Sequence, residues 1–439
     1  MTKPKEASQP QQAPNNEGSK TAAQKYTTKF RLKAMVSLFD NEERRDNSSN
    51  IFEEQLWCCA FEPDLNDPLN STTDLIAVAS DYQVVLVNCE TLKIKSRLDM
   101  FNKGEVFYAL AWTYFGYAYE NKVETILAAG GFQGVVYLVV PKHKKYYHQF
   151  QAHDTSIQAL MFCPENKSHL YSADDHGFVF LHDIGVPQGQ YLKHDVVKLK
   201  VFTGMESAGA LGLVMPVIGQ ERYLLAASEE GLHCWKLNNN NKLNSLNEPK
   251  REHRICTAYF KDSHEGVSFD ALKMINDGFV ITKQIKDRYI YLWKFSSLID
   301  KINALPPDER STRDETYTCT IDNFSKLLWS DTEEIYLNIC GGKSRVFAGD
   351  SEGSLWCYNV YPQIKRSLKN KEELQGDIIK PQYVLSKPKI TMNGKSMEEL
   401  DSSDMKFNNL TNSADMKYIV VATDTNLVAI YESYKAKRN

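Results

Sequence analysis

The sequence lacks the features that would place it in several specialised classes of protein. It contains no apolar run of about 18 residues, so it predicts no membrane-spanning helix. Residues 1–25 have no apolar segment like that of a secretory signal, and their Pro, Gln and Asn content predicts a disordered tail. The nine cysteines are scattered without a C-x-x-C pair. This pattern argues against a disulfide framework or a zinc cluster and favours a reducing compartment, the cytosol or the nucleus.

A strong net charge is also missing. The chain has 52 Lys and Arg against 56 Asp and Glu, a net charge of −4. Proteins that bind nucleic acid with much of their surface are usually strongly basic, so we do not expect that mode of binding. Nucleic acid could contact the protein at most through basic loop patches, in the runs 142–145, 250–254 and 435–438.

The motifs of common enzyme classes are absent. We find no G-x-S-x-G, no P-loop, no G-x-G-x-x-G and no H-E-x-x-H. Histidine does stand beside aspartate at His153-Asp154, Asp174-Asp175-His176 and His182-Asp183. These three places are equivalent within repeats, so we interpret them as structural hydrogen-bonding groups. The sequence therefore predicts a non-enzymatic protein with no catalytic residue, no cofactor and no metal site.

One short pattern recurs seven times along the chain. Each copy has an apolar segment, a polar turn and a second apolar segment, and a further β-rich segment precedes it. Most turns contain Asp or Gly, as tight hairpins require. The copies are residues 76–89, 126–140, 170–184, 224–237, 279–295, 346–360 and 419–433.

Seven units of four strands, spaced by about 40–60 residues, predict an all-β fold, a seven-bladed WD40-type β-propeller over residues 26–434. A two-sheet sandwich fits seven copies of one unit poorly. We expect the strand Phe30–Val36 to close the ring by completing the last blade. We expect polar insertions on blade loops and a basic C-terminal end at residues 435–439. The insertions are residues 238–251, 301–316, 363–382 and 392–412.

Three aromatic residues mark a candidate site. Trp57 opens the first blade's innermost strand, Tyr108 takes the matching place after Phe107 in the second, and Tyr336 lies in the matching strand of the sixth. Innermost strands line the central channel, so these rings would gather at one channel mouth. Ring faces attract a quaternary ammonium group, and methyl-lysine is the obvious candidate. Packing of the rings between blades is the alternative interpretation.

Several segments resemble known propellers of chromatin proteins. Residues 56–61, 107–114 and 127–130 resemble the embryonic ectoderm development (EED) propeller, the histone-reading subunit of a Polycomb methyltransferase. A second set is similar to the WD domain of the origin-recognition-complex-associated leucine-rich-repeat and WD-repeat family. It comprises residues 57–63, 183–187, 350–353 and 423–430.

The resemblance implies a function. In this family the channel mouth binds trimethyl-lysine of a histone tail in an aromatic cage, which here would be Trp57, Tyr108 and Tyr336, with Phe107 and Ile335 beside it. Ile335 stands where the Polycomb reader has another aromatic residue. The resemblance also implies a nuclear, chromatin-associated scaffold that binds a trimethylated histone tail peptide and either the origin recognition complex or histone methyltransferase subunits. A WD40 interaction scaffold without methyl-lysine binding is the alternative.

Overall fold

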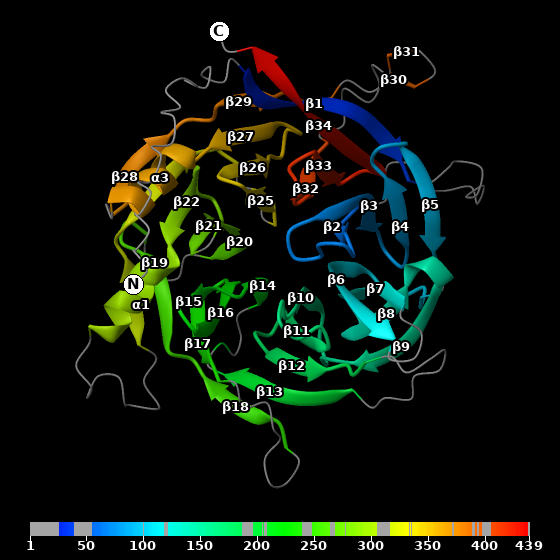
Figure 1. Cartoon of the computed structure of the whole chain (residues 1–439), viewed down its shortest axis with the longest axis horizontal. Coiled ribbons are helices and arrows are strands. Elements are labelled where there is room, and N and C mark those ends of the chain that lie inside the picture. The colour runs from blue at the N-terminus through cyan, green and yellow to red at the C-terminus, as the bar shows by residue number, and fades with distance from the viewer. Residues whose placement is uncertain are drawn as a thin grey trace, which may run out of the picture.

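The computed structural model shows a closed ring of seven β-sheets around a central axis (Figure 1). The predicted fold class, a seven-bladed β-propeller, is confirmed. Within residues 26–437 the structure describes everything except positions 39–54, 100, 118–121, 187–195, 204, 206–208, 239–247, 264–267, 277, 305–316, 333, 335, 371–372, 389–390, 393–394 and 397–404. The predicted tail, residues 1–25, lies outside the described part.

Blades 1, 2 and 6 each form a four-stranded antiparallel sheet. Blade 1 comprises β2 (Cys58–Pro63), β3 (Thr72–Ala79), β4 (Val84–Asn88) and β5 (Lys93–Leu98). Blade 2 comprises β6 (Phe107–Tyr117), β7 (Lys122–Gly131), β8 (Val135–Val140) and β9 (Lys145–Gln151), with the short helix η1 (Pro141–His143) between the last two. Blade 6 comprises β25 (Ile339–Gly342), β26 (Arg345–Gly349), β27 (Leu355–Asn359) and β29 (Tyr383–Leu385).

Blades 3, 4 and 5 have the same core of four strands. Blade 3 comprises β10 (Ile157–Phe162), β11 (His169–Asp174), β12 (Val179–Asp183) and β13 (Val197–Thr203). Blade 4 comprises β14 (Ala210–Val214), β16 (Glu221–Ser228), β17 (Gly231–Leu237) and β19 (Cys256–Phe260), with the short β15 (Val217–Ile218) beside β16. Blade 5 comprises β20 (Phe269–Asn276), β21 (Phe279–Gln284), β22 (Tyr289–Lys294) and β24 (Phe324–Leu328).

Each repeated sequence copy forms the second and third strands of one blade. Copy 76–89, for example, forms the β3–β4 hairpin, whose partners run from Leu75↔Asn88 to Ala79↔Val84. Glycines in these turns have the left-handed backbone that a tight turn needs, with φ of 71° at Gly134 and 83° at Gly177. The seven predicted hairpins are therefore confirmed.

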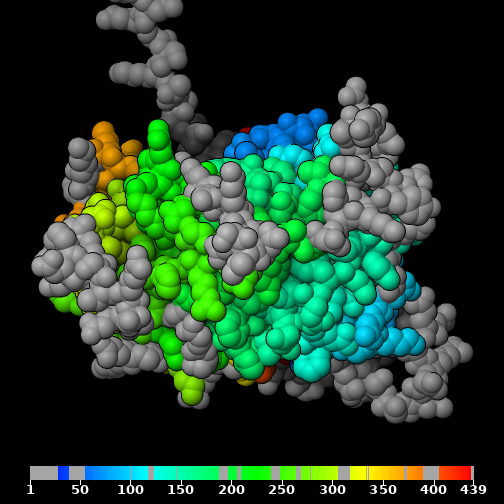
Figure 2. Space-filling model, turned by 90° about the horizontal axis from the view of Figure 1, so that it is seen from below, coloured from blue at the N-terminus to red at the C-terminus, as the bar shows by residue number. Residues whose placement is uncertain are grey.

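The polar insertions lead into additional strands that the sequence did not predict. Three of them return along the ring and add a parallel fifth strand to the outer edge of the preceding blade. Figure 2 shows this outer wall from the side, with blade 3 in teal beside blade 4 in green. The added strands are β18 (Lys250–His253), β23 (Thr318–Ile321) and β28 (Gln375–Ile379). The helices α1 (Phe295–Asn303) and α3 (Tyr361–Asn370) precede β23 and β28 in the chain. A small hairpin of β30 (Thr391–Met392) and β31 (Lys395–Ser396) lies near the start of the fourth insertion.

The N-terminal strand closes the ring. Blade 7 comprises β32 (Phe407–Asn412), β33 (Tyr418–Thr423), β34 (Leu427–Lys437) and β1 (Tyr26–Ser37). Strand β1 pairs antiparallel with β34, so the first and last parts of the described chain lie side by side (Figure 1). The predicted closure by Phe30–Val36 is confirmed. Residues 435–437 of the predicted basic end continue β34, and the last two residues lie outside the described part.

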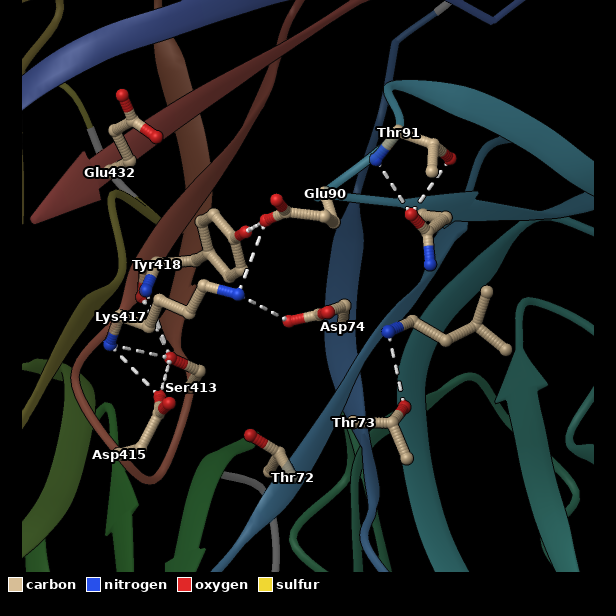
Figure 3. A network of polar contacts seen from close by, with 12 residues as sticks. Thr72, Thr73, Asp74, Glu90, Thr91, Ser413, Asp415, Lys417, Tyr418 and Glu432 are labelled. Carbon is tan, nitrogen blue, oxygen red and sulfur yellow. Dashed lines mark hydrogen bonds and ion pairs between the residues drawn. The ribbon is translucent and has the colours of Figure 1, made fainter.

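The seam between blades 7 and 1 also carries a polar network (Figure 3). Lys417, directly before β33, lies 3.2 Å from Asp74 and 3.2 Å from Glu90, both on blade 1. The Tyr418 hydroxyl donates to Glu90, and Lys33 of β1 lies 3.4 Å from the same carboxylate. These donors lower the pKa of Glu90 to about 2, the Tyr418 hydrogen bond acting most strongly. The network therefore joins both ends of the chain to the first blade.

Hydrophobic cores fill the seams. Seven clusters of buried residues are found in the described chain, and each combines side chains from two neighbouring blades. Burial of such surface contributes about 25 cal/mol per Å². Because every blade needs both neighbours to bury its two faces, the sheets are stable together as one ring.

Candidate functional site at the channel mouth

A cavity of about 530 Å³ lies on the axis of the ring. All seven blades contribute to its wall, which places it in the central channel and not in a seam between two blades. Cavities of this size are typical of binding sites. In order of blades, its wall includes Trp57, Tyr108, Gln158, Leu211, Asp270, Tyr336 and Asn408. All three predicted aromatic residues therefore lie around one cavity.

A β-bulge recurs at the start of the innermost strand in five blades. In each case the pairing with the second strand slips by one residue, and the extra residue lines the cavity. A bulge bends the strand locally and re-aims a side chain. The bulged residues are Tyr108, Gln158, Leu211, Asp270 and Asn408.

Trp57 and Tyr108 form one side of the cavity. Their ring centroids lie 5.6 Å apart and their planes are nearly perpendicular, at 89°. The Trp57 backbone N–H donates to the Ala79 carbonyl at 3.0 Å, which fixes this residue at the entrance to β2. Both side chains are half-buried, so part of each ring faces the cavity.

Tyr336 lies on the cavity wall, but in a loop and not in the strand that the sequence predicted. It precedes β25, which begins at Ile339, so the prediction that it lies in the innermost strand of blade 6 is wrong. Its backbone is left-handed, with φ of 62°, and its side chain is 49% exposed. The backbone N–H donates to Asp270 Oδ2 at 2.9 Å. A contact across 66 residues of sequence thus replaces the strand ladder expected at this position.

The two residues predicted to lie beside the cage have different outcomes. Phe107 is fully buried in the core between blades 1 and 2, with its ring 4.8 Å from that of Phe101 and 5.8 Å from that of Tyr137. The alternation of side chains along β6, together with the bulge at Tyr108, places Phe107 in the core while Tyr108 faces the cavity. Ile335 lies outside the described residues.

Carboxylates form much of the remaining wall, and sequence reasoning missed them. Asp270, Glu334 and Asp424 line the cavity, and Lys406 forms an ion pair with Glu334 at 2.5 Å. Burial raises the pKa of Asp270, against the lowering effect of the Lys283 ammonium. Burial likewise raises the pKa of Asp424.

Further carboxylates surround the cavity tyrosines from the hairpin turns. Burial raises the pKa of Tyr108, and Asp81 and Asp175 are among the carboxylates that raise it further. The pKa of Tyr336 is raised by burial and then by Glu229, Asp270 and Asp175. In their own repeats, Asp81, Asp175, Glu229 and Asp424 take the same position in the turn that follows the second strand of the blade. Aligning the repeats position by position would have revealed this acidic rim from the sequence.

An additional aromatic residue occupies that same turn position in blade 2. Phe132 follows β7, is 58% exposed and lines the cavity. The alignment that reveals the acidic rim would also have identified Phe132, because it matches Asp81 and Asp175 in the neighbouring repeats. The mouth therefore offers Trp57, Tyr108, Tyr336 and Phe132 to a ligand.

The histidine–aspartate groups of blade 3 form a buried network. His153 Nδ1 lies 3.0 Å from Asp174 Oδ2, and its Nε2 lies 2.7 Å from Ser172 Oγ, which in turn lies 3.0 Å from His182 Nε2. The order Ser–His–Asp is that of a hydrolase triad. Ser172 is fully buried, however, so its hydroxyl cannot meet a substrate. The structural interpretation of these residues is supported.

The described residues contain no helix long and apolar enough to cross a membrane. Nor do they bring together three His, Cys, Asp or Glu side chains in a metal-binding group. The predicted basic runs are partly neutralised: Lys142 lies 3.7 Å from Glu124, and Lys250 lies 3.0 Å from Glu252.

Taken together, the fold and the cavity define a WD-repeat β-propeller with an aromatic and acidic channel mouth. Residues 29–434 match the family model described as the WD domain of leucine-rich repeat and WD repeat-containing protein 1. The chain belongs to this family.

Curated relatives carry the same name. The chain is 28% identical over 400 residues to leucine-rich repeat and WD repeat-containing protein 1 of Mus musculus, which covers 88% of this chain and 56% of the mouse protein. The proteins of Homo sapiens and Xenopus laevis are each 27% identical and cover 88% of this chain. The chain spans about half the length of the curated relatives it matches, for example 51% of the Xenopus laevis protein.

Solved structures show the same fold. A chain in the crystal structure of the Chaetomium thermophilum polycomb repressive complex 2 superposes with a TM-score of 0.63 at 13% identity, covering 93% of this chain and 99% of that one. A chain in the structure of that complex with H3K27me3 and H3K27M also gives a TM-score of 0.63 at 13% identity, with 92% and 97% covered.

Proposed function

We propose that the channel mouth binds a trimethylated lysine side chain of a histone tail, and that the protein acts in the nucleus as a non-enzymatic chromatin reader and scaffold. Its other surfaces bind partners in a chromatin complex, either the origin recognition complex or histone methyltransferase subunits. The observation that carries the proposal is the meeting of Trp57, Tyr108 and Tyr336 around one open cavity.

The geometry of the rings supports this ligand. Trp57 and Tyr108 stand nearly perpendicular, so a cation in the corner that they form meets two aromatic surfaces that face in different directions. Each exposed cation–π contact contributes about 0.5–1 kcal/mol, and about 2 kcal/mol when desolvated. Three rings would supply about 2–5 kcal/mol, which is consistent with micromolar affinity for a peptide that makes further contacts.

The charge of the mouth supports a basic peptide. Asp270, Glu334 and Asp424 line the cavity. Lys283 pairs with Asp270 and Lys406 pairs with Glu334, so Asp424 and the rim carboxylates Asp81, Asp175 and Glu229 supply the remaining negative charge. A carboxylate rim attracts a cation over distances of about 10 Å at moderate salt. A histone tail carries several Lys and Arg residues, so it matches the rim as well as the cage.

Two comparisons favour chromatin as the setting. The family relatives are leucine-rich repeat and WD repeat-containing proteins, and one complex with a propeller of this fold was solved with H3K27me3. The second comparison concerns the fold alone, at 13% identity.

Calorimetry with histone-tail peptides, trimethylated and unmodified, tests the proposal. We expect the wild type to prefer the trimethylated peptide, and Trp57→Ala and Tyr336→Ala to lose at least about tenfold in affinity, or about 1.4 kcal/mol. Tyr361→Ala is the matched control, because Tyr361 is an exposed aromatic residue on α3. Equal binding of both peptides by the wild type would refute methyl-lysine reading and leave the scaffold function.

A further inference from the structure

We propose that Asp270 is a positioning residue that holds Tyr336 in its cavity-lining conformation, and that Lys283 keeps Asp270 in place. This inference rests on the proposed function, because the position of Tyr336 matters through the ligand that it contacts. A residue of blade 5, Asp270, would thus control the conformation of Tyr336, which lies just before the first strand of blade 6.

Tyr336 needs an external anchor. Its φ of 62° is left-handed, a region that residues with a Cβ avoid unless neighbouring structure holds them there. It precedes β25, so no strand ladder fixes its backbone. The hydrogen bond from its N–H to Asp270 Oδ2, at 2.9 Å, supplies a charged acceptor for this residue.

Asp270 is itself held in a fixed position. It is the bulged residue at the start of β20, the place where blade 2 carries Tyr108, so the bulge directs it to the cavity. Lys283 Nζ of β21 lies 2.5 Å from Asp270 Oδ2, and the two side chains are 1% and 0% exposed. The same ammonium lies 5.2 Å from the ring centre of Trp329. One carboxylate oxygen therefore accepts from both Lys283 and the Tyr336 backbone.

The arrangement predicts how the site fails when the acceptor is removed. Without the Asp270 oxygen, the Tyr336 backbone can leave the left-handed region, and only a fraction of molecules presents the tyrosine to the ligand. The apparent dissociation constant rises as the inverse of that fraction. The loss concerns the methylammonium contact, so it falls on methylated peptides and spares the binding of unmodified ones through the acidic rim.

The test uses two double variants of the full chain, because breaking a buried ion pair on one side alone can unfold a protein. Asp270→Asn with Lys283→Met removes both charges but keeps a side-chain oxygen for the Tyr336 N–H. Asp270→Ala with Lys283→Met removes the oxygen as well. Thermal unfolding is measured for both, along with calorimetric binding of trimethylated and unmodified histone-tail peptides.

We expect the Asn/Met variant to bind the trimethylated peptide within about threefold of the wild type, and the Ala/Met variant to bind it about tenfold more weakly. Both should bind the unmodified peptide equally. Equal binding of the trimethylated peptide by the two variants would overturn the role of Asp270, as would an equal loss for both peptides in the Ala/Met variant. If Trp57→Ala also binds normally, the proposed function itself fails; if only the Asp270 result is negative, the cage survives without this anchor.

Discussion

The rings of Trp57 and Tyr108 stand nearly perpendicular, at 89°, with 5.6 Å between their centres. They come from different blades, and each reaches the axis by its own route. Trp57 is held just ahead of β2 by a hydrogen bond to Ala79, whereas Tyr108 is the bulged residue of β6. Neither ring covers the other face to face, so both keep surface available to a ligand.

The first prediction concerns the contribution of the Trp57 ring to peptide affinity. Its indole Nε1 donates to no partner in the described structure, so Trp57→Phe removes no hydrogen bond. Phenylalanine keeps a weaker aromatic face. We expect about a threefold loss of affinity for trimethylated peptide, against about tenfold or more for Trp57→Ala. Calorimetry measures both, and equal losses would show that shape, not the ring face, determines binding.

The second prediction concerns the acidic rim. Glu229 is exposed and its carboxylate acts on Tyr336 across the mouth. Glu229→Gln should weaken a basic peptide about twofold at low salt, mostly through a slower association rate, and the difference should shrink as salt rises. Stopped-flow fluorescence measures the rates. Glu248→Gln is the matched control at the outer edge before β18; if it has the same effect, overall charge and not the rim is responsible.

The third prediction tests ring closure. Phe30 of β1 is 2% exposed and its ring lies 5.1 Å from that of Phe347 in blade 6. Phe30→Ala should lower the free energy of unfolding by about 3–5 kcal/mol, because it leaves a cavity between the closing strand β1 and blade 6. Leu32→Ala, on the same strand but 37% exposed, should cost less than about 1 kcal/mol. Urea denaturation compares them, and similar costs would contradict a role for Phe30 in closure.

The fourth prediction is a loss of stability in mild acid. Burial lowers the pKa of His182 to about 3 and that of His233 to about 3. The unfolded chain therefore binds more protons between about pH 6.5 and pH 3, and stability is complete above pH 6.5 and declines as pH falls. Each histidine should cost about 2 kcal/mol between pH 7 and pH 5.

Chemical denaturation at the two pH values measures this slope. His182→Gln should remove about half of the loss of stability that we assign to the two histidines between pH 7 and pH 5. This expectation concerns the pH dependence and holds even if the substitution changes the stability at pH 7. His253→Gln removes an exposed imidazole and serves as the control. An unchanged slope in His182→Gln would mean that other groups cause the acid sensitivity.

Much of the fold could be predicted because its signals are local. The hairpin of each blade lies within about 15 continuous residues, and its alternation and turn residues act over that range. The closing strand was predictable too, since Phe30–Val36 alternates and a ring of blades leaves one edge to be paired. The parallel strands β18, β23 and β28 were missed, because short polar segments have no sequence pattern from which pairing with the preceding blade could be predicted.

The site could be predicted only in part. Trp57 and Tyr108 were identified from their places at strand starts, and Tyr336 was identified although it lies outside the strand expected for it. The separation of Phe107 from Tyr108 depends on a bulge, which is a property of the pairing between β6 and β7 and not of either segment alone. The contact between Tyr336 and Asp270 likewise has no local signal.

The amino-acid sequence by itself determined the seven hairpins, the closing strand and the aromatic residues available for a site, because these follow from patterns within single segments. Only the tertiary structure decided which residues share the channel mouth. Ring closure brings positions as distant as Trp57 and Asp424 to one cavity, and the repeated bulges decide which side chains face it. The physical reason is that the alternation of residues along a strand determines which of its faces is buried. Which residues meet at the axis depends instead on how the strands pair and on contacts with other blades.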